Sequence, residues 1–180
     1  MEPVKVFYNK KEYLETHTGN KVCRKSLIRG SHNIHLNGKC IISPGVVIRG
    51  DLAPVKIGKY TIFKEDVVLR PSYKRAKGKL KYITMQIGEH VLIEEGSIVC
   101  ASKIGNNVHV GKNCIISHRC VLRDNCKIED GAILSPDTEV PSFTIYGGKP
   151  ATYLADMPDS TVFMHTELTQ GYYNRFLPLA

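Results

Sequence analysis

Three histidines near the middle of this 180-residue chain are the side chains best suited to do chemistry. His90, His109 and His118 could each serve as a metal ligand or as a general base, because a neutral imidazole carries a free lone pair. Either role needs side chains that converge on one place. The elements that carry these histidines therefore decide whether they form a site.

The chain also contains six cysteines, but no CxxC pair of the kind typical of zinc and redox sites. We expect reduced thiols that serve as small buried apolar groups. Three of them follow one another at six-residue intervals. The six are Cys23, Cys40, Cys100, Cys114, Cys120 and Cys126.

A six-residue repeat organises most of the sequence. An aliphatic or aromatic residue opens each unit and a small or β-branched residue usually stands in the fifth place, with residues suited to tight corners between them. Alternate side chains of a short strand point to opposite faces, so the opening and fifth-place residues can share one interior. Units open at Leu36, Ile42, Ile48, Ile57, Phe63, Ile87, Ile93, Val99, Ile104, Val110, Ile116, Leu122, Ile128 and Leu134.

This repeat predicts an all-β fold, a parallel β-helix (hexapeptide-repeat solenoid) in which three units make one triangular coil of about 18 residues. Left-handed winding is what similarity to hexapeptide proteins implies, and the spacing alone does not show it. A β-sandwich of short strands is the alternative, but it would show variable loop lengths.

The same geometry separates the chemical side chains. Cys114, Cys120 and Cys126 fall on three different faces of a coil, with the core between them. His109 follows the inward-pointing Val108 and so faces outward. The remaining two histidines occupy corner or outward positions, so we expect all three histidines to be exposed.

Three segments leave the repeat and define the predicted domain organisation. Residues 1–21 are an N-terminal cap or edge segment, because a solenoid end exposes unpaired strand edges. Residues 22–150 form the β-helix, which is interrupted at about 71–86 by an insertion too long for a corner. Residues 151–180 form a C-terminal tail with an α-helix at about 160–176.

The insertion carries five basic side chains. It is either a partner-binding element or a solvated loop. These candidate partner-binding residues are Lys74, Arg75, Lys77, Lys79 and Lys81. The predicted helix has an apolar stripe at i, i+4 spacing, which we expect to pack on the solenoid, although a docking role is the alternative. The stripe consists of Met164, Leu168, Tyr172 and Phe176.

Composition limits the kinds of partner. The formal charge of +8 favours an acidic partner. The chain shows no glycine-rich phosphate loop, zinc-finger spacing or aromatic RNA-binding signature, so we predict no nucleic-acid binding. It also has no apolar run of signal-peptide or membrane-spanning length, which predicts a cytosolic protein without an integral membrane segment.

The segment IRGDLAPVKIG at 48–58, the repeats and the C-terminal helix resemble the γ-class carbonic anhydrase-like branch of hexapeptide proteins. The resemblance implies one metal held by three histidines between the subunits of a trimer, which acidifies a bound water. Arg70, Glu95 and Cys100 stand at the positions of these histidines. A guanidinium cannot ligate a cation and repels it, so we predict no metal, no cofactor and no hydrase activity. Arg49 and Asp51 match a structural ion pair of that family.

Two enzyme hypotheses remain beside a binding role. One is a γ-carbonic-anhydrase-like metalloenzyme with a relocated site. The other is a hexapeptide acyltransferase, which would hold a CoA thioester between solenoids and use a histidine as its base. No loop offers a clear catalytic histidine, and the fold alone does not determine the function.

Segments outside the repeat make the resemblance more specific. The stretches at 8–26, 109–128, 140–150 and 172–179 are similar to the β-helical pointed-end subunits of dynactin, which makes cytoplasmic dynein processive and joins it to cargo. The resemblance implies a non-catalytic scaffold, a pseudoenzyme that supports dynein-driven microtubule transport and recruits endosomal membrane cargo. Implied partners are subunit 6 (a related β-helix protein), an actin-related protein, subunit 4 and cargo adaptors. The implied location is cytoplasmic and cytoskeletal, on microtubules, the centrosome and the kinetochore.

Overall fold

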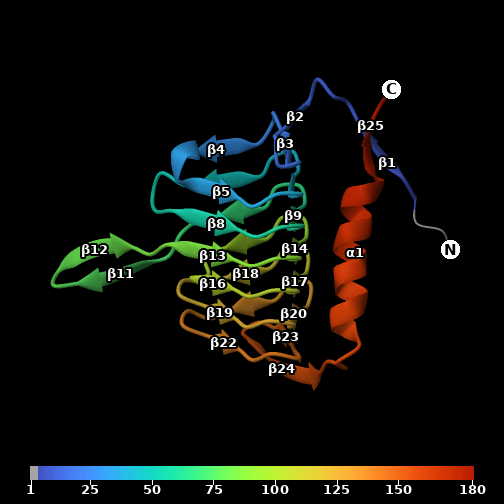
Figure 1. Ribbon diagram of the computed structural model, residues 1–180. Helices are drawn as coiled ribbons and strands as arrows, with labels where there is room; N and C mark the ends of the chain where they lie inside the picture. Colours follow the sequence, from blue (N-terminus) through green and yellow to red (C-terminus); the bar gives the residue numbers. More distant parts are fainter. Residues whose placement is uncertain (1–3) are drawn as a thin grey trace.

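Stacked three-sided coils form the body of the protein, a left-handed parallel β-helix with one long helix on its side (Figure 1). The computed structural model describes residues 4–180. The prediction of a hexapeptide-repeat solenoid with a C-terminal α-helix is confirmed.

Each side of the solenoid is one sheet of parallel strands. Face 1 has six strands, β4 (Leu27–Arg29), β7 (Val47–Arg49), β10 (Val68–Leu69), β15 (Ile98–Val99), β18 (Ile115–Ile116) and β21 (Ile133–Leu134). Face 2 also has six, β5 (Ile34–Leu36), β8 (Val55–Ile57), β13 (Met85–Ile87), β16 (Lys103–Ile104), β19 (Val121–Leu122) and β22 (Glu139–Val140).

Face 3 has nine strands because it continues into both ends of the solenoid. Its parallel central strands are β3 (Lys21–Cys23), β6 (Ile41–Ile42), β9 (Ile62–Phe63), β14 (Leu92–Ile93), β17 (His109–Val110), β20 (Lys127–Ile128) and β23 (Thr144–Gly148). One antiparallel strand closes each end, β2 (Tyr13–Glu15) on β3 and β24 (Ala151–Asp156) on β23. These strands cover edges that parallel coils would leave unpaired.

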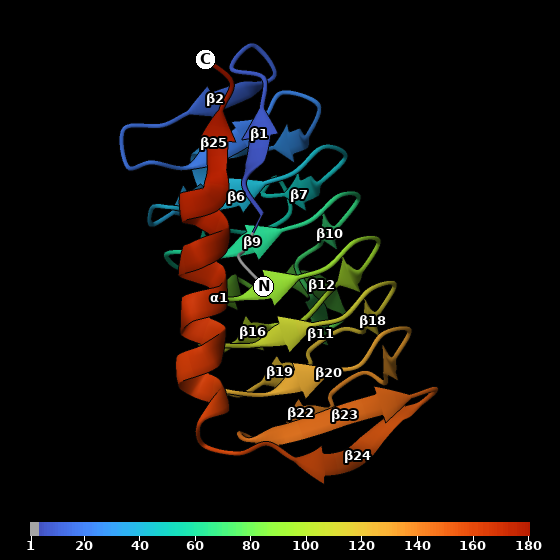
Figure 2. The ribbon, with the colours of Figure 1, turned by 90° about the vertical axis from the view of Figure 1, so that its right-hand side faces the viewer.

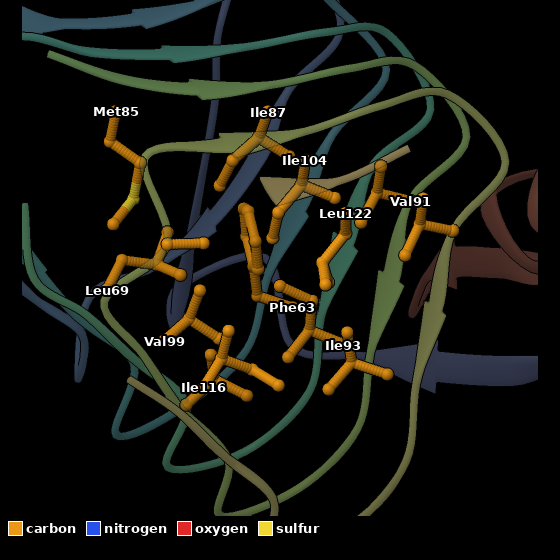
Figure 3. Packing of buried hydrophobic residues seen from close by; sticks show 14 of the residues in the cluster. Phe63, Leu69, Met85, Ile87, Val91, Ile93, Val99, Ile104, Ile116 and Leu122 are labelled. Atoms are coloured by element: carbon orange, nitrogen blue, oxygen red, sulfur yellow. The ribbon is translucent and has the colours of Figure 1, made fainter. Parts of the chain in front are cut away.

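The core is a column of side chains from the opening and fifth places of the repeat. Figure 3 shows these side chains converging from all three faces, with Phe63 among Ile93, Ile104 and Leu122. All six cysteines are buried free thiols, as predicted, and Cys114, Cys120 and Cys126 have no exposed surface. Asparagines at several corners adopt a positive φ, for example +56° at Asn107, which the tight turn requires.

The helix α1 (Thr161–Arg175) runs along the outside of face 3, over strands from several coils (Figures 1 and 2). It continues through Gly171 and ends at β25 (Phe176–Pro178), which pairs in parallel with β1 (Val6–Tyr8). The prediction that the apolar stripe packs on the solenoid is wrong for its first half, because Met164 is 66% and Leu168 46% exposed. The helix instead turns Thr169 and Tyr173 toward the solenoid. Within residues 4–180, no helix is long and apolar enough to cross a membrane.

The end of α1 is fixed by an aromatic cluster around a buried lysine. Lys21 on β3 donates a hydrogen bond to the Phe176 carbonyl, and its ammonium lies 4.3 Å from the Tyr173 ring centroid. The Tyr173 hydroxyl donates to the Gly19 carbonyl at 2.6 Å. Tyr8 of β1 stacks on Phe176 with 4.6 Å between ring centroids. Strands β1 and β25 therefore pack together beside face 3.

A short 3-10 helix (Ser31–Asn33) lies between β4 and β5.

Residues 71–86 form a hairpin rather than an irregular loop. Strands β11 (Tyr73–Ala76) and β12 (Lys79–Tyr82) pair antiparallel and project from the solenoid between β10 and β13 (Figure 1). Lys77 and Gly78 both have positive φ, which is the geometry of a type I′ turn. We call residues 73–82 the basic arm.

Candidate functional site

Two of the three positions of the implied metal ligands, those of Arg70 and Cys100, lie side by side on face 1. Arg70 and Cys100 follow the neighbouring strands β10 and β15, and the Arg70 N–H donates to the Val99 carbonyl at 2.9 Å. Glu95 precedes β15 and lies 3.9 Å from the Lys64 ammonium. Burial raises the pKa of the Cys100 thiol, and the nearby Arg70 charge opposes this only in part.

A guanidinium, an undissociated thiol and an ion-paired carboxylate do not fit a divalent cation. Among residues 4–180, no group of three or more His, Cys, Asp or Glu side chains has an arrangement that could hold a metal ion.

The expectation that His90 and His109 are exposed is wrong, because α1 covers both side chains. His90 Nδ1 lies 2.8 Å from Thr169 Oγ1, and His165 Nε2 donates to the His90 carbonyl at 2.7 Å. His109 donates to Glu94 Oε2 at 3.0 Å, and its ring centroid is 6.0 Å from that of His165. Burial lowers the pKa of His90 and lowers that of His165 to about 4. His90 and His165 are thus neutral polar contacts that dock the helix.

His118 also differs from the expectation, because it packs against the root of the basic arm. Its ring lies 4.6 Å from that of Tyr73, measured between centroids. Burial, followed by the charges of Arg119 and Arg70, lowers the pKa of His118.

The guanidinium of Arg119 holds the arm in place. Its Nη1 donates to the Tyr73 carbonyl at 2.6 Å, and its Nε lies 2.8 Å from Asp137 Oδ1. Its backbone N–H donates to the Ser72 hydroxyl at 2.9 Å. Arg119 therefore anchors the root of the arm, and Asp137 of the next coil holds the Arg119 guanidinium in position.

The basic arm presents its charges to solvent. Lys74 lies directly opposite Lys81, and Lys79 shares their face of the ribbon. All five basic side chains of the arm are exposed. Like charges in directly opposed positions destabilise a hairpin. These lysines thus do not stabilise the arm itself, which favours a role in binding an acidic partner.

Arg49 and Asp51 form a two-pronged ion pair on the surface. Arg49 Nε lies 2.9 Å from Asp51 Oδ1, and Nη2 lies 3.0 Å from Oδ2. The hydrogen bonds from Arg49 hold the pKa of the Asp51 carboxyl below its usual range. The pair follows β7, the second strand of face 1.

Sequence reasoning missed His165 and Thr169, two of the helix residues that form hydrogen bonds with the solenoid. Their i, i+4 spacing places them on one side of a helix. This spacing could have predicted a polar face that docks on the solenoid. It also missed Lys21, for which the sequence alone gives no sign of burial.

The stacked coils of six-residue units and the helix along one face define a hexapeptide-repeat β-helix protein. Solved structures agree on the fold. A hexapeptide transferase family protein from Anaplasma phagocytophilum superposes with a TM-score of 0.67 at 22% identity, covering 91% of this chain and 96% of that one. AntD, an N-acyltransferase from Bacillus cereus, superposes with a TM-score of 0.70 at 13% identity, covering 93% of this chain and 98% of that one.

Sequence relatives identify the particular family. The family model for Dynactin subunit 5 matches residues 1–180. Dynactin subunit 5 of Dictyostelium discoideum is 50% identical over 172 residues, which are 96% of this chain and 87% of the relative. Mitochondrial gamma carbonic anhydrase 1 of Arabidopsis thaliana is 22% identical over 142 residues, 79% of this chain and 51% of the relative. The chain belongs to the dynactin subunit 5 family, as the irregular segments of the sequence predicted.

Proposed function

We propose that this dynactin subunit is a non-catalytic scaffold of the pointed-end complex, which supports dynein-driven transport and recruits endosomal cargo. The observation that carries the proposal is the replacement of all three ligand positions by Arg70, Glu95 and Cys100 in a chain that keeps the β-helix. Membership of the dynactin subunit 5 family supports it independently.

The proposed partners are subunit 6, the pointed-end actin-related protein, subunit 4 and cargo adaptors. The basic arm supports such contacts, because it projects from the solenoid and carries charges that its own fold does not use. The proposed locations are the microtubule cytoskeleton, the centrosome and the kinetochore.

Charge reversal tests the arm. We expect Lys74→Glu, Arg75→Glu, Lys77→Glu and Lys79→Glu together to weaken binding of an adaptor or neighbouring subunit by about tenfold or more at physiological salt. The thermal unfolding midpoint should stay nearly constant, because these side chains are exposed.

The matched control carries reversals at exposed lysines of face 2, Lys56→Glu and Lys103→Glu. The measurement is the fraction of tagged chain that sediments with purified dynactin, together with binding of a purified adaptor. Unchanged binding by the arm variant would show that the arm is a solvated hairpin that contacts no partner.

Enzyme activity is tested on the purified chain. We expect less than stoichiometric zinc, cobalt or iron by elemental analysis, and no CO2 hydration or acyl transfer from acetyl-CoA above background. Stoichiometric metal with hydrase activity, or turnover of the thioester, would refute the scaffold proposal.

A further inference from the structure

The helix α1 runs along face 3 (Figure 2), and its apolar stripe lies on one flank of the helix, beside the contact. Met164, Leu168 and Tyr172 follow one another at four-residue intervals, so they share that flank. Thr169 and Tyr173 are the buried residues of the helix and face the solenoid. Docking of the helix therefore does not explain the stripe.

Two cavities lie between this flank and face 3. Their volumes are about 240 Å³ and about 290 Å³, and apolar atoms make up most of their lining. His109 and Leu168 line both cavities, so the two adjoin. Met164 lines the first cavity and Tyr172 the second. The stripe thus forms one wall of both cavities.

A row of outward side chains on face 3 forms the floor of the cavities. Ile62, Leu92, His109 and Lys127 stand in register on neighbouring strands, and each of them lines a cavity. Four rungs at ~4.8 Å spacing span about 14 Å, and the wall formed by the three stripe residues spans about 12 Å at ~1.5 Å per residue. We call the space between this floor and this wall the stripe groove.

The two ends of the stripe groove differ in charge. Lys127, beside the first cavity, forms no ion pair within the described chain, residues 4–180. Lys64, at the other end, lies 3.9 Å from Glu95 Oε1 and 5.2 Å from the ring centroid of Tyr172. Asn125 also lines the first cavity, and its buried Oδ1 has no hydrogen-bond partner in the part of the chain that the structure describes. An acidic head group of a ligand would therefore bind at the Lys127 end.

The shape of the groove excludes a peptide backbone. Strands β9, β14, β17 and β20 are each paired on both sides, so the floor has no free backbone groups for an extended peptide. The two cavities together have a cross-section of roughly 40 Å² over about 14 Å. An α-helix about 10 Å wide needs about 80 Å². A hydrocarbon chain is narrower and has no polar groups to satisfy.

A saturated chain also matches the length of the groove. Carbon–carbon bonds of ~1.5 Å in a zigzag advance roughly 1.3 Å each, so about 14 Å holds about eleven carbons. We propose that the stripe groove binds a fatty acid, with the hydrocarbon chain beside α1 and the carboxylate at Lys127. The inference goes beyond the scaffold role and does not depend on it, because it concerns a small ligand of this chain alone.

Calorimetric titration of the full chain with saturated fatty acids, each below its micelle concentration, tests the groove. The series runs from butanoate to tetradecanoate in steps of two carbons. We expect a single binding site whose affinity rises about fourfold for each added methylene and reaches a plateau near about twelve carbons, when the groove is full. An affinity that does not depend on chain length, or that rises without a plateau, would overturn the inference.

Two substitutions separate the head group from the chain. Lys127→Gln should weaken decanoate binding about tenfold and leave 1-decanol binding unchanged, because only the acid pairs with the lysine. Leu168→Gln should weaken both ligands about fivefold, because it removes apolar surface from the wall of both cavities. The matched control is Phe163→Gln, at a site that is 68% exposed and lines neither cavity, and it should bind both ligands like the wild type.

Thermal melting followed by circular dichroism checks that the variants fold. Leu168 is 46% exposed, so its substitution should change the midpoint little; if Leu168→Gln does not fold, Met164→Gln, at a site 66% exposed, replaces it. Equal affinity of all variants, or no saturable binding of any fatty acid to the wild type, would overturn the inference. The groove would then be left to an apolar side chain of a protein partner, and the scaffold proposal would stand.

Discussion

Acidification should release α1 from face 3, because His165 is held neutral at the contact. Its Nε2 donates to the His90 carbonyl, and its neighbours on the solenoid are His90 and His109, the latter bonded to Glu94. A proton added to His165 would lie in a mostly buried site beside two other imidazoles. Burial is the main reason that its pKa falls to about 4.

The sign and size of the effect follow from linkage. The folded-state pKa lies below the unfolded value of about 6.5, so the unfolded chain binds the proton more tightly. Stability is unaffected well above pH 6.5 and is lost as the pH falls toward 4. The loss from His165 alone is about 2 kcal/mol between pH 7 and pH 5, and about 3 kcal/mol in total. His90 also has a lowered pKa and acts in the same direction.

Urea unfolding at pH 7, 6 and 5, followed by circular dichroism, measures this effect. His165→Gln is the informative variant, because its amide can still donate to the His90 carbonyl but does not titrate. The difference in unfolding free energy between wild type and variant should shift by about 2 kcal/mol from pH 7 to pH 5, in favour of the variant. A difference that stays constant with pH would refute the reasoning.

Three further predictions concern the core, the helix end and the thiols. Phe63→Ala should lower the unfolding free energy by about 3–5 kcal/mol in urea titrations, because Phe63 is fully buried, whereas Phe163→Ala, at a site 68% exposed, should change it by less than about 0.5 kcal/mol. Equal effects would contradict the packing described. Tyr173→Phe removes the hydrogen bond to the Gly19 carbonyl and should cost about 1 kcal/mol, seen as faster amide exchange in α1. Unchanged exchange would count against a docked helix end. Burial raises the pKa of Cys126 to about 12, so iodoacetamide at pH 8 should modify it only after urea unfolds the chain, and rapid labelling of the native chain would argue against a buried thiol.

The sequence by itself determined the solenoid. Each inward side chain, such as Ile93, contacts the same positions of the coils above and below, so a local repeat carries the whole core. The helix was predictable within a residue at each end for a similar local reason. The sequence also shows that Arg70, Glu95 and Cys100 stand where the related enzymes have metal-binding histidines, because this needs only the residue types.

Only the tertiary structure decided what covers each face. His90 and His109 point outward, as the repeat requires, yet they are half-buried because a helix that comes much later in the sequence, Thr161–Arg175, lies over them. The orientation of that helix depends on contacts such as His165 with the His90 carbonyl, which no apolar stripe reveals. The outward aliphatic side chains of face 1 come from residues as far apart as Leu27 and Ile133, and their exposure depends on which elements pack over that face. Periodicity fixes which side of a strand points inward, but burial of the outward side depends on contacts distant in sequence.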